Sequence, residues 1–301
     1  MQTLFLINPA SGRKQDAEET AQLISEIYGK AGKPVTYEMI DFSRLDQRLE
    51  EAIAAGIHRI YAVGGDGTVN AIGTRLMHKP VCFGVIPKGS GNGYARNLGF
   101  SIRTKLAISQ TLNAAPIQVD TATFNGQPFL NVAGVGLDAV VAWIFSEGKN
   151  RGFGPYIRST AEGMLGYEPE DYEVEINGER VKKEKLMGIA IANGTQWGYN
   201  AKISPHASLT DGLLDIIMVR KFPILRVGSI VGKLFNGKMQ KSRYVEVHRA
   251  REIKIWRKDS GPAQIDGEPI EAGREIHIQI QEKSLQVLLP NTLTEKKIQS
   301  L

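Results

Sequence analysis

A glycine-rich turn between an apolar run and a helical pattern constrains the fold of this chain more than any other feature. The turn is Gly64-Gly65-Asp66-Gly67-Thr68-Val69-Asn70. The run Ile60-Tyr61-Ala62-Val63 precedes it, and apolar positions of helical spacing continue to Leu76. A strand, a glycine-rich turn and a helix in this order form the phosphate-binding edge of an α/β sheet. Because a lone carboxylate repels phosphate, Asp66 indicates a bridging Mg²⁺, although the motif alone fits equally well a tight turn in which Asp66 caps the helix.

The same alternation of strand and helix extends over residues 1–117. Apolar segments at 4–7, 35–40, 59–63 and 81–86 alternate with helical patterns. Continuous apolar strands separated by helices predict an α/β domain with a doubly wound parallel sheet. Polar turns follow the first, third and fourth strands, and the carboxyl ends of parallel strands lie at one edge of a sheet. Three such turns predict a ligand site at that edge.

The pattern changes near Pro116. The hairpin signals Asn125-Gly126 and Asn177-Gly178 separate short strand-like runs, and such runs recur as far as Leu289. We therefore expect residues 118–290 to form a second domain, an antiparallel β-sandwich, with residues 291–301 either fraying or returning to the first domain. Strands are expected at 179–181, 186–192, 275–280 and 285–289 among others, and helical insertions at 139–146, 157–165 and 224–235.

Composition restricts the class of protein. The chain has 37 basic and 32 acidic residues, a net charge of +5, and a single cysteine, Cys82, which excludes a disulfide framework and favours a reducing cytoplasm. The amino terminus lacks the features of a signal peptide. The apolar run at residues 139–145 is far too short to span a bilayer, so we expect any membrane contact to be peripheral.

Several common site motifs are absent. The chain has no P-loop signature, no Gly-x-Gly-x-x-Gly after the first strand and no Gly-x-Ser-x-Gly elbow. Its five histidines lack the spacing of zinc ligands. These absences exclude a P-loop protein, weaken a dinucleotide-binding interpretation, and argue against a nucleophile elbow and a zinc site.

Five motifs together resemble one family. The first three are Asn8-Pro9-Ala10-Ser11-Gly12, the turn at residues 64–70 and Gly89-Ser90-Gly91-Asn92. The other two are Asp211-Gly212-Leu213-Leu214-Asp215 and Asp266-Gly267-Glu268. In this order and spacing they resemble the diacylglycerol kinase catalytic-domain family, which includes bacterial lipid kinases and sphingosine and ceramide kinases. The resemblance covers nearly the whole chain.

The resemblance implies an active site between two domains and ATP-dependent phosphorylation of a lipid hydroxyl. It implies that the nucleotide is held by Asn8, Pro9, Ala10, Ser11, Gly12, Gly64, Gly65, Asp66, Gly67, Thr68, Val69, Asn70 and Ser90. Asp66 would act through Mg²⁺, and Glu268 would accept the proton with Asp266 close by. Which of these two carboxylates is the base stays open, and on spacing alone the motif is more typical of a hairpin turn. Ser208, Asp211 and Leu213 would hold a second, structural Mg²⁺, partly through backbone carbonyls.

Two positions depart from the family pattern. Ile40 falls near the place where bacterial members often offer threonine to the nucleotide, and Ala71 replaces a glutamate that many members carry. Neither position belongs to the reacting groups. These two departures leave open the affinity for the nucleotide and the preference for ATP over other nucleoside triphosphates.

Basic residues are concentrated in one stretch. Residues 220–258 contain 12 lysines and arginines but only two acidic residues, together with an apolar helical pattern. A basic stretch with an apolar helix suits an anionic membrane surface, whereas a core-facing helix between solvated strands is the alternative. Because the implied substrate is a lipid, we favour peripheral membrane docking.

Two other functions compete with a lipid kinase. An NAD kinase shares the Gly-Gly-Asp-Gly loop but carries an Asn-Glu pair, and no Asn-Glu dipeptide occurs here. A non-catalytic sensor of nucleotide or lipid is disfavoured by Asp66, Asp266 and Glu268. No nucleic-acid partner is expected. The acceptor, diacylglycerol-like or sphingoid, and the oligomeric state, for which a homodimer is the commonest choice, are left open.

Overall fold

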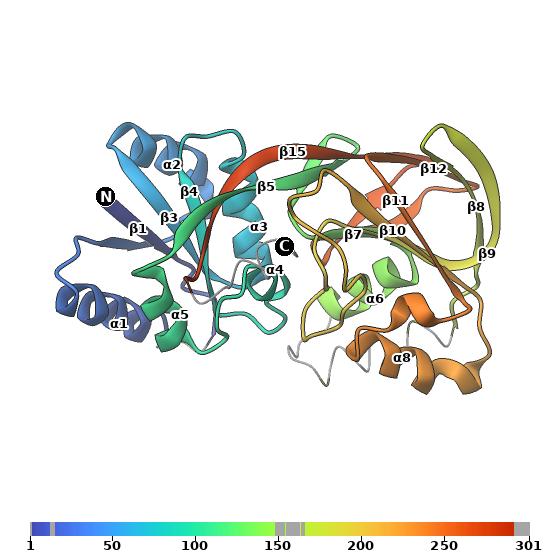
Figure 1. Ribbon diagram of the computed structural model, residues 1–301, viewed down its shortest axis with the longest axis horizontal. Helices are drawn as coiled ribbons and strands as arrows, with labels where there is room; N and C mark the ends of the chain where they lie inside the picture. Colours follow the sequence, from blue (N-terminus) through green and yellow to red (C-terminus); the bar gives the residue numbers. More distant parts are fainter. Residues whose placement is uncertain (1, 13–15, 148–153, 155–162, 164–165, 292–301) are drawn as a thin grey trace. The chain divides into compact units, whose positions relative to one another are not determined.

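The chain forms two compact units in the computed structural model, which describes residues 2–12, 16–147, 154, 163 and 166–291 (Figure 1). Unit 1 comprises the residues up to Val119 and the segment that begins at Lys283, and unit 2 comprises Asp120–Glu282. No helix in these ranges is both long enough and apolar enough to cross a membrane.

Unit 1 is built on a parallel sheet, as predicted. Its strands are β1 (Gln2–Ile7), β2 (Thr36–Met39), β3 (Ile57–Gly64), β4 (Cys82–Pro87) and the end of β15 (Glu275–Leu289). They lie in the order β15-β4-β3-β1-β2, and every neighbouring pair among them is parallel. The side chains of β1, β3 and β4 are almost all buried, which is why these segments are apolar without alternation.

Helices cover this sheet. They are α1 (Asp16–Lys30), α2 (Leu45–Ala54), α3 (Asp66–Arg75), α4 (Gly93–Asn97) and α5 (Thr104–Thr111), with a 3₁₀ turn η1 (Phe42–Arg44). In α1 the residues of one face, among them Ile24 and Tyr28, are buried. Tyr28 packs edge-on against Phe5 of β1, and its hydroxyl lies 2.8 Å from that of Thr111 on α5. Strand β1 and helices α1 and α5 therefore contribute to one core. Each helix can pack there because its apolar residues recur at helical spacing.

Unit 2 is an antiparallel β-sandwich, also as predicted. Its strands are β5 (Ala115–Phe124), β6 (Gln127–Phe129), β7 (Val132–Gly136), β8 (Glu170–Ile176), β9 (Glu179–Ala192), β10 (Leu214–Arg220), β11 (Val245–Ala250), β12 (Glu252–Arg257), β13 (Gly261–Ile265), β14 (Glu268–Ala272) and the first part of β15. Strands β14-β13-β7-β9-β8-β12-β15 follow one another, and β10 joins β9 to β11. Aliphatic and aromatic side chains from nearly all of them form one buried core.

Helices and 3₁₀ turns accompany these strands in the described part of unit 2. They are α6 (Leu137–Glu147), α8 (Val227–Phe235), η2 (Ile224–Arg226) and η3 (Met239–Lys241). Figure 1 shows α6 and α8 on the same side of the strands of this unit. A smaller buried cluster, to which Ile217 and Met239 belong, lies against Ile230 and Leu234 of α8.

The structure differs from the predicted elements in three places. β9 and β15 are each continuous where two strands were expected, because Lys185 and Lys283 take positive φ (53° and 48°) and kink the strands without ending them. β14 was not predicted. The helix expected at 157–165 falls almost wholly outside the described residues.

Candidate active site

The first two loops of unit 1 are tied together by Asn8. Its side-chain amide donates to the Thr68 hydroxyl at the start of α3 (2.7 Å), and its side-chain oxygen accepts the backbone N–H of Ala10 (2.9 Å). The backbone N–H of Asn8 donates to the carbonyl of Val63 on β3 (3.0 Å). The loop after β1 is therefore held against the glycine-rich turn after β3, as the shared sheet edge predicts.

The second and third loops pass each other at backbone contact. A Cβ atom placed on Gly89 would lie 2.5 Å from the Cα of Gly65, and one placed on Gly64 would lie 2.5 Å from the side chain of Thr68. The backbone N–H of Lys88 donates to the carbonyl of Gly64 (2.8 Å). Only glycine permits this approach, which brings the two loops together at the sheet edge where backbone N–H groups of such folds bind phosphate oxygens.

Asp66 connects these two loops. It is the first residue of α3 and not its cap, because Gly65 occupies the cap position. Its carboxylate accepts the backbone N–H of Gly93, the first residue of α4 (2.8 Å). Asn92 before it has φ 51°, and its side chain bonds the N–H and the carbonyl of Gly89 (2.9 and 2.7 Å). The alternative of a plain helix cap at Asp66 is thus wrong.

In unit 2, Asp266 lies in the tight turn between β13 and β14. Its carboxylate accepts the backbone N–H groups of Leu130, Asn131 and Val132 at 2.9, 2.8 and 3.0 Å, and its own N–H donates to the Val132 carbonyl (2.8 Å). Its φ is 50°, which short polar residues tolerate better than bulky ones. Asp266 therefore holds the β6–β7 connection to the turn.

Glu268 is placed differently. It is the first residue of β14 and exposed, and within the described residues its carboxylate has no hydrogen bond or ion pair. The two carboxylates of the motif are therefore chemically distinct: both oxygens of Asp266 accept N–H groups, whereas those of Glu268 are available to a ligand.

A buried carboxyl is linked to the same turn. Gln264 on β13 accepts the backbone N–H of Gly267 with its side-chain oxygen (2.9 Å), and its amide donates to Asp138 (3.2 Å). Asp138, near the start of α6, also accepts the N–H of Ala139 (2.9 Å). Burial raises the pKa of Asp138 to about 7, and these two hydrogen bonds oppose the shift without cancelling it.

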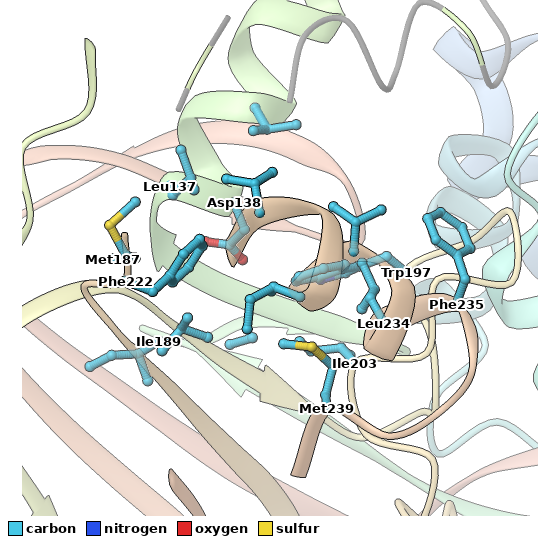
Figure 2. Close-up of a pocket in the computed structure, with 17 residues that line it drawn as sticks. Leu137, Asp138, Met187, Ile189, Trp197, Ile203, Phe222, Leu234, Phe235 and Met239 are labelled. Carbon is cyan, nitrogen blue, oxygen red and sulfur yellow. The ribbon is translucent and has the colours of Figure 1, made fainter. Parts of the chain in front are cut away.

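Asp138 lines an apolar cavity of about 130 Å³ in unit 2 (Figure 2). The walls come from α6, β9, β10, α8, η3 and the connections before and after β10. They include Leu137, Met187, Ile189, Trp197, Ile203, Phe222, Leu234 and Met239. Figure 2 shows the Asp138 carboxyl among these side chains. An apolar cavity with one convergent polar group is a typical binding site for an apolar ligand with a polar end.

Comparison with known proteins decides the family. The model of the diacylglycerol kinase catalytic domain matches residues 2–124, and that of the YegS C-terminal NAD kinase beta sandwich-like domain matches residues 131–289. The chain belongs to the diacylglycerol kinase catalytic-domain family. It is 31% identical over 279 residues to a Chromohalobacter salexigens protein named "Probable lipid kinase YegS-like", covering 89% of this chain and 86% of the relative.

Other relatives of this lipid kinase agree. A Bacillus subtilis protein named "Diacylglycerol kinase" is 25% identical over 269 residues, which is 88% of either chain. A solved structure from Bacillus anthracis str. Sterne shares the fold, with a TM-score of 0.80 and 22% identity over 97% of this chain and 98% of the other. The prediction of a lipid kinase is confirmed, and the two competing functions lose their support.

The residues predicted to hold a structural cation lie together on the loop before β10 of this lipid kinase. The Asp211 carboxylate accepts the backbone N–H of Leu213 (3.1 Å) and is ion-paired with Arg249, which also bonds Asp215 (3.0 Å). The Ser208 hydroxyl accepts the N–H of Thr210 (3.2 Å). The oxygen donors suit Mg²⁺, but a guanidinium occupies the carboxylate, so a cation would have to displace Arg249.

The sequence analysis placed Asn92 in the third motif without giving it a role, and it did not identify Asp138, Gln264 and Lys88 as site residues. Lys88 follows β4 and pairs with Asp16 at the start of α1 (3.4 Å), which ties the third loop to the first. The polar Gln264 within the apolar segment of β13 was a signal that could have been read, because a buried amide needs partners. Asp138 carried no such signal, since it reads as an ordinary acidic residue in the first turn of a helix.

Proposed function

We propose that this lipid kinase transfers the γ-phosphate of ATP to the hydroxyl of a lipid, diacylglycerol-like or sphingoid, that it takes from a membrane. The observation that carries the proposal is in unit 2, where the apolar cavity is connected through Asp138 and Gln264 to the turn that bears Asp266 and Glu268. A lipid chain in that cavity would place its polar end toward this turn.

The loops of unit 1 would bind the nucleotide. Phosphoryl transfer needs cradled phosphates and compensation of their charge more than it needs covalent chemistry from the protein. The glycine backbone at Gly64 and Gly65 and the N-terminus of α3 would supply the cradle. Asp66 is a hard oxygen donor beside that cradle and so fits a Mg²⁺, which when bound would neutralise developing phosphate charge.

Glu268 would be the proton acceptor and Asp266 the positioning residue. The proton of an alcohol leaves late in a loose phosphoryl-transfer transition state, so a nearby carboxylate with available oxygens is sufficient. Glu268 is exposed and has such oxygens. Asp266 accepts three backbone N–H groups, and taking a proton would cost it those hydrogen bonds.

The carboxyl of Asp138 would meet the polar part of the lipid. A group with a pKa near 7 is largely protonated below neutral pH, and a neutral carboxyl can donate a hydrogen bond as well as accept one. The ester, hydroxyl and amide groups of lipids can each form a hydrogen bond with such a carboxyl. The cavity therefore supports a lipid acceptor without choosing between glycerol and sphingoid backbones.

The site of action would be the surface of an anionic membrane on its cytoplasmic side, where the protein binds peripherally. The basic stretch at residues 220–258 supports this proposal, because such stretches are attracted to anionic lipid headgroups.

A direct assay tests the proposed function. The protein is incubated with ATP labelled in the γ-phosphate, Mg²⁺ and vesicles that contain diacylglycerol, sphingosine, ceramide or a polyprenol, and the lipid phase is separated. We expect label in at least one lipid and none in NAD or in water-soluble alcohols. Label that transfers only to a soluble acceptor contradicts the proposal.

A further inference from the structure

The turn η2 presents two large aliphatic side chains to solvent. Ile224 is 65% exposed and Leu225 is 94% exposed, the highest values among the exposed large hydrophobic residues of the described chain. Proline precedes them, and the preceding strand β10 is largely buried. Isolated exposed aliphatic residues are common on proteins, but an adjacent pair at the tip of a turn needs a reason.

The helix that follows is a wall of the apolar cavity. Val227, Ile230, Val231, Leu234 and Phe235 of α8 all line it, and Figure 2 shows this helix beside the cavity. None of the residues of α8 is buried. One continuous segment therefore carries an apolar tip in solvent and the least covered wall of the cavity.

Positive charge without carboxylate partners gathers on the same segment. Residues 221–243 contain six basic residues and no acidic one: Lys221, Arg226, Lys233, Lys238, Lys241 and Arg243. Within the described ranges none of the six forms an ion pair with a carboxylate. By contrast, Arg220, Arg249, Arg251 and Lys254 are paired with Glu246, Asp211, Glu282 and Glu175. Lys221 and Arg226 therefore flank the apolar tip in the chain, and the other four basic residues follow it.

We propose that residues 221–235 are the membrane-contact element of this protein. Ile224 and Leu225 enter an anionic bilayer, the surrounding lysines and arginines bind its headgroups, and α8 separates the bilayer from the cavity. Apolar side chains flanked by basic residues are what such an interface requires. The inference rests on the proposed function for what enters the cavity, but contact with the bilayer does not depend on it.

The size of the cavity implies that α8 moves when a lipid enters. A volume of about 130 Å³ is close to that of an engineered cavity of about 150 Å³ that binds benzene, so it holds only a short part of an acyl chain. Because α8 has no buried side chain, it is the wall whose displacement breaks the fewest buried contacts. Contact of η2 with the bilayer would displace this wall toward the acyl chains.

A double variant tests the contact. Ile224→Ser with Leu225→Ser removes the apolar tip, and Ile102→Ser with Leu106→Ser, at residues 54% and 50% exposed in unit 1, is the matched control. Binding to vesicles of phosphatidylglycerol and phosphatidylcholine is measured by co-sedimentation. We expect about tenfold or more weaker binding for the first variant and unchanged binding for the control. Equal binding of both variants and the wild type overturns the proposal.

A probe independent of activity separates this inference from the proposed function. Cys82 is the only cysteine, so Cys82→Ser with Leu225→Cys allows a single environment-sensitive fluorophore to be attached at position 225, and Leu106→Cys serves as the control. On phosphatidylglycerol vesicles we expect a blue shift at 225 and none at 106. A label at 225 that stays in water while the bound enzyme phosphorylates lipid refutes the inference but keeps the function. A blue shift at 225 without any lipid phosphorylation supports the inference and contradicts the proposed function.

Discussion

Two residues at the candidate site have the same unusual backbone conformation. Asn92 and Asp266 both have φ near +50°. The Asn92 side chain bonds the N–H and the carbonyl of Gly89 within its own turn, whereas the Asp266 carboxylate accepts backbone N–H groups of the β6–β7 connection. Such residues tolerate positive φ because the side chain can hydrogen-bond locally. At the residue scale, therefore, the loops are shaped by side chains that are not themselves placed to react.

Asp66→Asn is expected to abolish turnover and to leave the melting temperature nearly unchanged. The amide oxygen can still accept the Gly93 N–H, so the link between the loops survives. The negative charge proposed to hold Mg²⁺ is lost. Turnover with labelled ATP and the thermal melting curve are the two measurements, and near wild-type turnover would show that Asp66 has no such role.

Glu268→Gln and Asp266→Asn are expected to fail in different ways. Glu268→Gln should lower kcat by about 10²-fold or more at an unchanged melting temperature, because general-base assistance is lost. Asp266→Asn should lower stability by about 1–3 kcal/mol, since its amide group would oppose backbone N–H donors. Kinetics and denaturant unfolding of both variants check this. If only Asp266→Asn loses activity while remaining stable, Asp266 is the base.

Asp138 should make stability depend on pH. Its folded pKa of about 7 lies above the unfolded value, so its stabilising contribution is fully present below about pH 4 and is lost as pH rises toward 7. Asp138→Asn removes this loss. Relative to the variant, the wild type should lose up to about 1.4 kcal/mol for each pH unit between roughly 4 and 7. Unfolding curves that run parallel across this range would contradict the assignment.

At the scale of elements, hydrogen bonds and ion pairs of polar side chains fix the turns that lie outside the strand ladders. The β13–β14 hairpin is anchored to β7 by Asp266 and to α6 by Gln264, so the turn that bears Glu268 has two supports. The loop before β10 is held to β11 by the pair of Asp211 and Arg249. Each connection orients a turn whose own backbone has few hydrogen bonds in a ladder.

The Asp211 loop offers a test of the structural cation. If Mg²⁺ binds there, it must compete with Arg249, so Arg249→Ala should show a larger rise in melting temperature with Mg²⁺ than the wild type. Asp211→Ala should show no rise and should be less stable without metal, because it removes one of the two carboxylates that pair with Arg249. The same metal-dependent shift in all three proteins would exclude Asp211 as a ligand.

At the scale of the whole molecule, a modest net charge hides an uneven distribution. The chain carries +5 in all, yet residues 220–258 hold 12 basic and two acidic residues, so the remainder is net negative. Several of these basic residues form ion pairs on β10, β11 and β12, whereas those of η2, α8 and η3 form none with the residues that the structure describes. The proposed attraction to an anionic surface would therefore be a local property of unit 2.

Binding to anionic vesicles should weaken as salt rises. Exposed charges are screened over about 10 Å at 0.1 M salt. Replacing Lys221, Arg226 and Lys238 by glutamate should raise the apparent KM for lipid in vesicles but not that for a dispersed short-chain lipid. An equal effect on both substrates would mean that these residues act on folding or on catalysis.

Local patterns in the sequence determined the parallel sheet, the antiparallel sandwich and the family. Buried strands and helix faces repeat at short periods, and the glycine-rich turns occupy consecutive positions, so both can be read along the chain. Two differences lie at Lys185 and Lys283, where the chain bends without ending an element, because a kink carries no compositional signal. The third is strand β14, which was not predicted. The structure brings the predicted loops of unit 1 together. The roles proposed for the nucleotide, metal and base residues remain predictions.

Only the tertiary structure decided which of two adjacent carboxylates is engaged and where a buried one lies. Asp266 and Glu268 have the same chemistry in sequence, but the first meets three backbone N–H groups from a segment about 135 residues earlier and the second meets none of them. Asp138 becomes a titratable group of the cavity because residues of α6, β9, β10 and α8 surround it. Burial and hydrogen bonding of this kind are set by contacts between distant segments, which local sequence patterns do not encode.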